Sequence, residues 1–530
     1  MGDALLNLIR AKAKLPAAPC PDPKAAAELS ALAGGDVYPA SLGAGRSVAF
    51  ALARRGLTKE LLLATDAAAP AVLDDFVGTA AKHAVPGGAI LLKLCPISEA
   101  NAAALRKHVA HLSPQPLGQA TSVGLGDRLG LATPAHLAAV AGAGVLPVLA
   151  QQSIREMTRT GRSPRQVVDD AMWGVLQAGW RGPWGSDADH LKTTADIDAT
   201  AAAGFCLFTI DPGEHVDNDV DNDDGPSCRA KYDRLPWQDL EIGKADCRES
   251  YQDKTFKLPG GLEVFFRETD VKQAAVKYGR AIAHTVKMHR HLVSVCAGRP
   301  VELEMSVDET AAPTTPAEHY FVANELARLG VRPASLAPRF VGRFEKGVDY
   351  QGDLDEFRRQ FALHAAIAQA LGPYKISLHS GSDKFSIYPI AAELTGGQIH
   401  LKTAGTSYLE ALRAIARIDG ELFREILAFA IERYPADRAS YMVSAEAERV
   451  RQPSGMKDAE LESVLDDLHG RQVLHVTFGS VLTARRDDGS PRFKHRLLRA
   501  LAEHEAVHYE TVRSHIARHL APFAKRTTGP

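Results

Sequence analysis

The chain has 530 residues, of which 24% are charged and 45% hydrophobic, and these proportions exclude a wholly disordered protein. Its 62 basic and 64 acidic residues give a formal charge of −2, so the clustered excess of base that a general nucleic-acid or anionic-membrane binder needs is not expected. Six cysteines without a C-x-x-C pair exclude a disulfide scaffold and a zinc ribbon. The first residues, MGDALLNLIRAKAK, contain an apolar run too short for a signal peptide or a membrane span. We therefore expect a cytoplasmic protein that binds neither nucleic acid nor membrane; the sequence leaves homo-oligomerisation open.

Residues 1–117 are predicted to form a small N-terminal α/β lobe. This part is rich in alanine, and its helical stretches alternate with short apolar runs such as residues 61–64 and 89–94.

Residues 118–415 show a regular alternation of short β-like runs and amphipathic helices. Strands that alternate with helices indicate parallel βαβ units, and eight such units predict an α/β fold, a (β/α)8 TIM-type barrel. The eight predicted strands are Ala120–Leu125, Val145–Ala150, Ser186–His190, Phe205–Ile210, Val301–Val307, Ala334–Ala337, Tyr374–Leu378 and Gln398–Lys402.

Two further regions flank or interrupt this pattern. Residues 212–260 are polar and aperiodic, which predicts an insertion in the barrel. Its run DNDVDNDDG resembles a calcium loop, but counting back from Gly225 places Val220 at the first ligand position, so we expect a solvated acidic loop. Residues 416–530 are predicted to form a helical C-terminal region packed on the barrel.

Three of the predicted strands carry polar side chains on the face that should point into the barrel. Alternation along the fifth strand puts Glu304 and Asp308 on one face, and the seventh and eighth strands do the same for His379 and for His400 with Lys402. Burying such groups is costly unless they pair or bind a metal, so the repetition favours a functional site at the strand ends. Each histidine, taken alone, could equally be a hydrogen-bonded core residue, and Glu304 could be half of a buried ion pair.

The end of the third strand adds Asp187, Asp189 and His190 to this group. Imidazoles and a carboxylate that converge from separate strands suit one divalent metal ion, Zn, Mn, Ni, Co or Fe, and the sequence does not choose among them.

One familiar motif points elsewhere. Residues 504–508, HEAVH, match the H-E-x-x-H zinc-peptidase pattern. They lie in an amphipathic C-terminal helix without an evident third ligand, so we interpret the match as chance.

The strand-end motifs closely resemble the tagaturonate/fructuronate epimerase family over about residues 118–450, and more weakly near 475–482. The motifs that carry the resemblance include LGDRLGLATPAH, AQQSIREMTRTGR, DADHLK, FTIDP, SVDET, LAPRFVGRFEKGVDYQGD, YKISLHSGSDKFSIYP and HLKTAGTSYLEA. The N-terminal lobe and the insertion match poorly.

The resemblance implies a metal-dependent isomerase that epimerises C4 of D-tagaturonate to give D-fructuronate, a reaction of hexuronate catabolism. It implies that Asp189 is the proton acceptor, Glu304 the proton donor, and His190 and His379 metal ligands. We add His400 as a third ligand on geometric grounds.

The substrate is predicted to be a small sugar. Among the cations near the strand ends, Arg339 is the first choice for a uronate carboxylate because its guanidinium binds carboxylates through two parallel hydrogen bonds. Lys402, Lys384 and Arg155 are the other cationic candidates, and Asp308 and Gln152 complete the predicted substrate-binding set.

Two mechanisms and several activities stay open at this point. C4 is β to the ketone and its proton is not acidic, so inversion requires either retro-aldol cleavage of the C3–C4 bond or prior movement of the carbonyl to C3. Alternative functions are a 4-epimerase of neutral ketohexoses (fructose and tagatose), a metal-dependent ketose isomerase or aldolase, and a sugar- or metal-binding protein without turnover.

Overall fold

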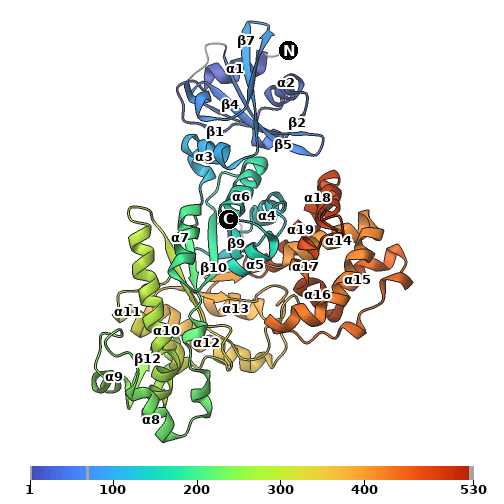
Figure 1. The fold of residues 1–530 in the computed structure, drawn as a ribbon. Coiled ribbons are helices and arrows are strands. Elements are labelled where there is room, and N and C mark those ends of the chain that lie inside the picture. Colours follow the sequence, from blue (N-terminus) through green and yellow to red (C-terminus); the bar gives the residue numbers. More distant parts are fainter. Residues whose placement is uncertain (1–2, 67–70, 525–530) are drawn as a thin grey trace, which may run out of the picture.

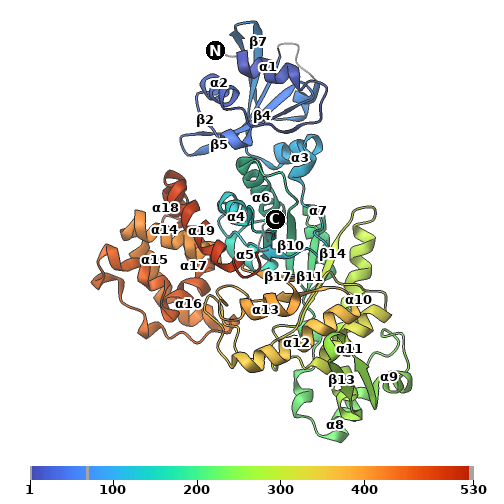
Figure 2. The same cartoon turned by 180° about the vertical axis from the view of Figure 1, so that it is seen from behind.

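The computed structural model describes residues 3–66 and 71–524, which form a lobe, a barrel and two flanking groups of helices (Figure 1). The N-terminal lobe lies at one end of the barrel, and the view from behind shows the insertion and the C-terminal helices on opposite flanks (Figure 2). Among the described residues, no helix combines the length and apolar character that a membrane crossing needs.

The N-terminal lobe is a seven-stranded antiparallel sheet with two helices on one face, and it confirms the expected small α/β lobe. Side chains alternate along β4 (Val48–Arg55). Ala49 packs among the residues of α1 (Asp3–Ala11) and α2 (Pro23–Ala33), whereas Phe50 joins the core that continues into the barrel. The other elements of the lobe are β1 (Ala18–Pro19), β2 (Asp36–Val37), β3 (Gly43–Gly45), β5 (Thr58–Asp66), β6 (Thr79–Val85), β7 (Gly88–Pro96) and α3 (Glu99–His108).

The barrel consists of the eight predicted strands, all parallel to their neighbours and closed in the order β10-β11-β14-β15-β16-β17-β8-β9. Every observed strand overlaps its predicted range, so the (β/α)8 prediction is confirmed. The strands are β8 (Ser122–Gly124), β9 (Leu146–Ser153), β10 (Gly185–Leu191), β11 (Leu207–Ile210), β14 (Glu302–Ser306), β15 (Ser335–Ala337), β16 (Lys375–Leu378) and β17 (Ile399–Lys402).

Helices cover the outside of the barrel, as the alternating pattern predicts. They are α4 (Thr133–Val140), α5 (Ile154–Thr160), α6 (Pro164–Ala178), α7 (Thr194–Ala203), α10 (Glu268–Val295), α11 (Pro316–Arg328), α12 (Leu354–Leu371), α13 (Tyr388–Thr395) and α14 (Thr406–Ile418). Along β14, Leu303 and Met305 pack into the apolar core, while Glu304 contacts side chains of β11 and β17 inside the barrel. The polar interior predicted from the alternation is therefore present.

The insertion folds into its own small elements on one flank of the barrel. They are α8 (Gly225–Asp233), α9 (Lys244–Tyr251) and the hairpin of β12 (Lys254–Lys257) with β13 (Glu263–Phe266).

The acidic run of the insertion is largely exposed, as expected for a solvated loop, and three of its carboxylates pair with lysines. Lys231 Nζ lies 3.0 Å from Asp217 and 2.6 Å from Asp223, and Lys277 Nζ lies 2.9 Å from Asp221. These lysines come from α8 and α10, so the local pattern of the acidic run did not reveal them. Because these carboxylates pair with lysines, they are not arranged as the ligands of a calcium loop.

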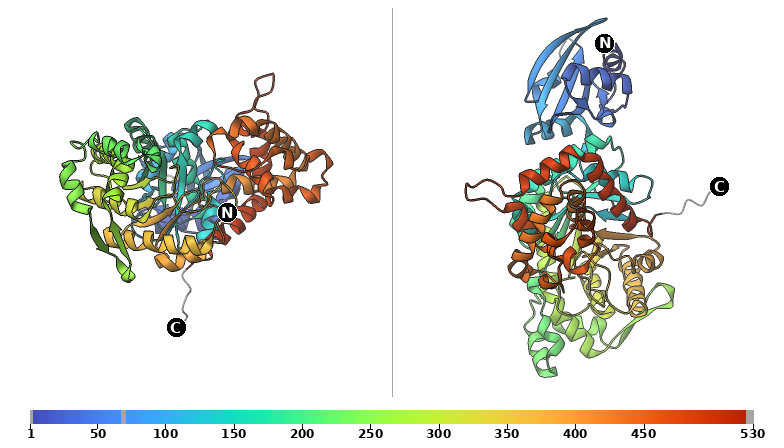
Figure 3. Two further views of the ribbon diagram at one scale, coloured as in Figure 1. Left: turned by 90° about the horizontal axis from the view of Figure 1, so that it is seen from below. Right: turned by 90° about the vertical axis from the view of Figure 1, so that its right-hand side faces the viewer.

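The C-terminal region is helical, as predicted, and it lies along one side of the barrel while the N-terminal lobe stands at the end (Figure 3). Most of its buried apolar residues form a hydrophobic core separate from the barrel core, whereas Val512, Ile516 and Leu520 of the last helix pack into the barrel core. After α14, its helices are α15 (Gly420–Asp437), α16 (Leu468–Val476), α17 (Phe478–Thr483), α18 (Lys494–Glu503) and α19 (Glu505–Leu520).

Candidate active site

One buried lysine gathers acidic side chains from two strands at the C-terminal end of the barrel. Lys402, the last residue of β17, is 4% exposed, and its Nζ donates a 2.8 Å hydrogen bond to Thr209 Oγ1. The same Nζ lies 2.8 Å from a carboxylate oxygen of each of Asp187, Asp189 and Glu304. Because one cation faces three acids, further positive charge is needed to balance the cluster when all three are ionised.

The protonation states of these acids differ because burial and charge compete at each one. At Asp189 and Glu304, burial alone would raise the pKa, but the charges of Lys402 and of a neighbouring histidine outweigh it and hold the pKa well below its ordinary value. At Asp187, burial prevails over Lys402 and raises the pKa to about 6. Asp189 and Glu304 are therefore ionised at neutral pH.

Two histidines supply the neighbouring positive charge. His379 Nε2 lies 2.5 Å from Glu304 Oε1, and His379 Nδ1 lies 3.2 Å from Asp308 Oδ1. His190 Nδ1 lies 2.8 Å from Asp189 Oδ1, and the two imidazole rings are 5.1 Å apart. Acids and histidines therefore alternate across the mouth of the barrel.

The backbone at His190 is strained. Its φ of 55° lies in the left-handed region, which costs a non-glycine residue about 1–3 kcal/mol and is held only where the surrounding structure demands it. In this conformation the imidazole of His190 contacts the acid cluster through Asp189.

The acid–histidine group fits a divalent metal ion. One ligand atom of each of Asp189, His190 and His379 lies within 4.8 Å of the others. Nε2 of His190 is buried and has no hydrogen-bond partner among the described residues, which leaves it available as a ligand. Two imidazoles and a carboxylate suit the divalent metals expected from the sequence, and a bound ion would replace the imidazolium protons as the source of positive charge.

His400 is not part of this close group. It lies two residues before Lys402 on β17, and its Nδ1 is 2.9 Å from Ser122 Oγ. Burial lowers its pKa to about 3, and its Nε2 has no hydrogen-bond partner among the described residues. A neutral imidazole with a free nitrogen stays compatible with ligation, so its predicted role stays a prediction.

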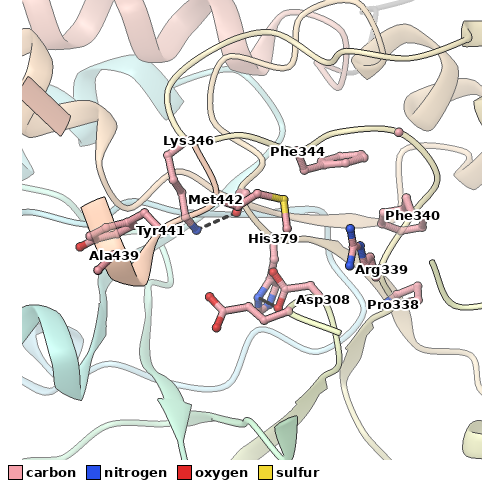
Figure 4. Close-up of a pocket in the computed structure, with 13 residues that line it drawn as sticks. Asp308, Pro338, Arg339, Phe340, Phe344, Lys346, His379, Ala439, Tyr441 and Met442 are labelled. Atoms are coloured by element: carbon pink, nitrogen blue, oxygen red, sulfur yellow. Dashed lines mark hydrogen bonds and ion pairs between the residues drawn. The ribbon is translucent and has the colours of Figure 1, made fainter. Parts of the chain in front are cut away.

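Two adjoining hollows open onto the cluster, and Figure 4 draws the residues that line the outer one. The inner hollow is lined by Asp189, His190 and Lys402, and the outer one, of about 430 Å³, by Asp308 and Arg339. This volume is that of a small-molecule site. Four residues line both hollows: Lys346, His379, Ser380 and Tyr441.

The two predicted arginines lie at these hollows. Arg339 lines the outer hollow and donates a hydrogen bond to the carbonyl of Thr310. Arg155 lines the inner hollow, 3.8 Å from Glu309, with its guanidinium over the ring of Tyr441.

The two glutamines of β9 point to opposite sides of the strand. Gln151 lines the inner hollow, and its Nε2 donates a 2.7 Å hydrogen bond to Asp189 Oδ2. Gln152, the predicted substrate-binding residue, accepts a hydrogen bond of 3.2 Å from Arg162. The predicted strand ends at Ala150, whereas the observed strand continues to Ser153. The inside–outside alternation of side chains that distinguishes Gln151 from Gln152 therefore lies beyond the predicted strand.

The two predicted lysines are committed to protein contacts. Lys402 is surrounded by the acid cluster, as described above. Lys384 is fully buried, and its Nζ donates hydrogen bonds of 2.8 Å to the carbonyl of Glu345 and 3.0 Å to that of Ser382. Lys384 therefore ties two pocket loops together.

The HEAVH segment makes structural contacts far from the barrel mouth. Glu505 lies 2.9 Å from Lys59 Nζ and accepts a 2.9 Å hydrogen bond from Tyr38, so it joins α19 to the N-terminal lobe. Its two histidines do not belong to any group of close metal-ligand atoms found among residues 3–66 and 71–524. The interpretation of this motif as a chance match agrees with these contacts.

A parallel (β/α)8 barrel with buried acids and histidines at the C-terminal ends of its strands defines a TIM-barrel enzyme. The tagaturonate epimerase (UxaE) family model matches residues 38–523, and the chain belongs to that family. A tagaturonate/fructuronate epimerase of Thermotoga maritima is 43% identical over 426 residues, which cover 80% of this chain and 85% of the relative.

Solved structures agree with the family assignment. The native crystal structure of the fructuronate-tagaturonate epimerase UxaE from Cohnella laeviribosi superimposes with a TM-score of 0.87 at 37% identity. The match covers 95% of this chain and 99% of that one. A glycerol complex of the same protein gives the same TM-score at 36% identity.

Proposed function

We propose that the chain interconverts D-tagaturonate and D-fructuronate by metal-dependent epimerisation at C4. The observation that carries the proposal is the placement of two ionised carboxylates, Asp189 and Glu304, on a single lysine beside a pair of histidines. The family membership and the name of the Thermotoga relative support this substrate pair.

Inversion at C4 needs two groups that exchange protons with the C4 oxygen. In the retro-aldol route, Asp189 accepts the proton of the C4 hydroxyl while the C3–C4 bond breaks to an aldehyde and an enediolate. The aldehyde rotates, the bond forms again on the other face, and the new C4 alkoxide takes a proton held between Glu304 and His379. Exchange with water then restores both groups to their starting protonation.

A divalent ion would supply a Lewis acid to the ketone end of the sugar. His190 and His379 would hold it, with a carboxylate of Asp189 or Asp308, whose Oδ1 lies 3.7 Å from His190 Nε2. His400 is the further predicted ligand.

Arg339 is the proposed partner of the uronate carboxylate. It lines the outer hollow, and no acidic side chain lies within ion-pair distance of its guanidinium among the described residues. Its guanidinium can therefore meet an anionic substrate.

The test is turnover in D2O followed by NMR. We expect tagaturonate to give fructuronate without deuterium at C3 or C4, because both carbons keep their hydrogens in the retro-aldol route. Deuterium at C4 would show that the reaction proceeds by the carbonyl shift rather than by retro-aldol cleavage. Absence of fructuronate would refute the proposed activity.

Chelation tests the metal requirement separately. We expect turnover to disappear after removal of divalent ions and to return when one of Mn, Ni or Zn is added. Full activity in protein shown to be metal-free would exclude the Lewis-acid role.

A further inference from the structure

Lys346 is a cation in the pocket that the sequence analysis did not select. It lies on the loop after β15, is half-buried and lines both hollows. Its Nζ donates a 2.7 Å hydrogen bond to Ser380 Oγ, and no acidic side chain lies within 4.0 Å of it among the described residues. By contrast, Arg128 of the inner hollow is paired with Glu156 at 2.7 Å. The charge of Lys346 is thus left for a ligand.

Side chains of helix α16 in the C-terminal region form hydrogen bonds with the loop segment that carries this lysine. Gln472 Nε2 donates hydrogen bonds of 3.3 Å to the carbonyl of Lys346 and 3.0 Å to Glu345 Oε2. Arg471 Nε donates a 2.7 Å hydrogen bond to the carbonyl of Gly347. Gln472 and Arg471 are buried, so the backbone on both sides of Lys346 is fixed by interior groups.

The chemistry of a hexuronate explains why a cation is needed here. Its carboxylate, C6, is only two bonds from C4, so an anion-binding group must stand close to the groups that act on C4. Lys346 meets this condition because its hydrogen-bond partner Ser380 directly follows His379 in the chain, and Figure 4 shows Lys346 and Arg339 on opposite sides of His379.

We infer that Lys346 is a further specificity-determining residue, which binds the C6 carboxylate of the substrate through its ammonium. This inference rests on the proposed function. A charged hydrogen bond of this kind strengthens binding by about ten- to a hundredfold.

The test compares Lys346→Met with wild type on tagaturonate and on the neutral ketose tagatose. The methionine keeps most of the aliphatic stem and removes the charge. We expect KM for tagaturonate to rise about tenfold or more above any change for tagatose. Lys346→Arg should restore much of the uronate affinity. The exposed lysine of the insertion gives the matched control Lys254→Met, for which no selective change is expected.

The outcomes separate this inference from the function on which it rests. Equal changes in KM for both sugars, or a fall in melting temperature without selectivity, would make Lys346 a structural residue and overturn the inference. A uronate-selective effect of Arg339→Met with none for Lys346→Met would also overturn it. If the wild type turned over neither sugar, the proposed function would fail, and calorimetric binding of tagaturonate against tagatose to the same variants would still decide the role of Lys346.

Discussion

At the scale of single residues, the site depends on charge balance inside a low-dielectric barrel. Lys402 compensates Asp189 and Glu304, and the histidines beside them supply the remaining positive charge. The same contacts that make burial tolerable also keep both carboxylates ionised. In the proposed mechanism, stability and proton transfer therefore rest on the same few atoms.

Glu304→Gln should abolish most turnover and leave metal binding intact. The amide keeps the shape of the side chain but cannot transfer a proton, so we expect kcat to fall by about 10²- to 10⁴-fold. Product NMR and elemental analysis of bound metal measure the two effects.

Glu302→Gln provides the control on the same strand. Glu302 is the first residue of β14, two residues before Glu304, and accepts hydrogen bonds from the backbone N–H groups of Leu117 and Gly118, 3.2 and 2.5 Å away. Its replacement should affect stability but not kcat. If Glu304→Gln retained wild-type kcat, Glu304 would not be the donor.

At the scale of elements, the C-terminal helices complete the pocket that the barrel begins. Asp383, on the loop after β16, lies 2.6 Å from His515 of α19 and 3.0 Å from Arg471 of α16. Arg471 also lies 3.1 Å from Glu410 of α14. These buried contacts fasten two helices of the C-terminal region to the loop that carries Ser380 and Ser382.

Arg471→Met should destabilise the protein strongly. It leaves Asp383 and Glu410 buried without their guanidinium partner, so we expect the free energy of unfolding to fall by about 3–5 kcal/mol. Urea denaturation measures the change. Arg513→Met is the matched control, because the Arg513 side chain is 43% exposed and its ion pair with Glu510 lies at the surface, so it should leave unfolding nearly unchanged. Equal effects of the two variants would contradict a structural role for the buried network.

Glu505→Gln should lower the melting temperature while sparing turnover. The change weakens the contacts of α19 with Lys59 and Tyr38 and should cost about 1–3 kcal/mol. Calorimetry and the NMR assay report the two properties on one sample. Loss of turnover without loss of stability would contradict a purely structural role for Glu505.

At the scale of the whole molecule, the parts that sequence could predict are those governed by periodicity. Alternation along the fifth strand located Glu304, and the polar ends of the third and seventh strands located His190 and His379. Lys346 and Tyr441 were missed because they lie in segments without helix or strand periodicity. Tyr441 reaches the barrel mouth from the C-terminal region, and nothing in the local sequence predicts that contact.

The whole molecule should also lose stability in mild acid because it buries neutral histidines. Burial lowers the pKa of His136, His364 and His519 to about 4, against an ordinary 6.5. Between pH 6.5 and about 4 the unfolded chain binds more protons than the folded one, so the free energy of unfolding falls as the pH falls through this window. Below about pH 4 these groups charge in both states and their contribution levels off.

Melting temperatures measured from pH 7.5 to 4 test this dependence. His136→Gln should make the decline shallower, whereas the exposed His495→Gln should leave it unchanged. A melting temperature constant across the window would contradict the burial of uncharged imidazoles.

The most direct test of the central claim is one NMR time course on protein loaded with Mn, Ni or Zn and supplied with tagaturonate or, separately, with fructose. We expect tagaturonate to be converted to fructuronate, faster than any conversion of fructose, and the reaction to stop on chelation. Absence of fructuronate from metal-loaded, folded protein would contradict the proposal that this acid–histidine cluster epimerises a hexuronate.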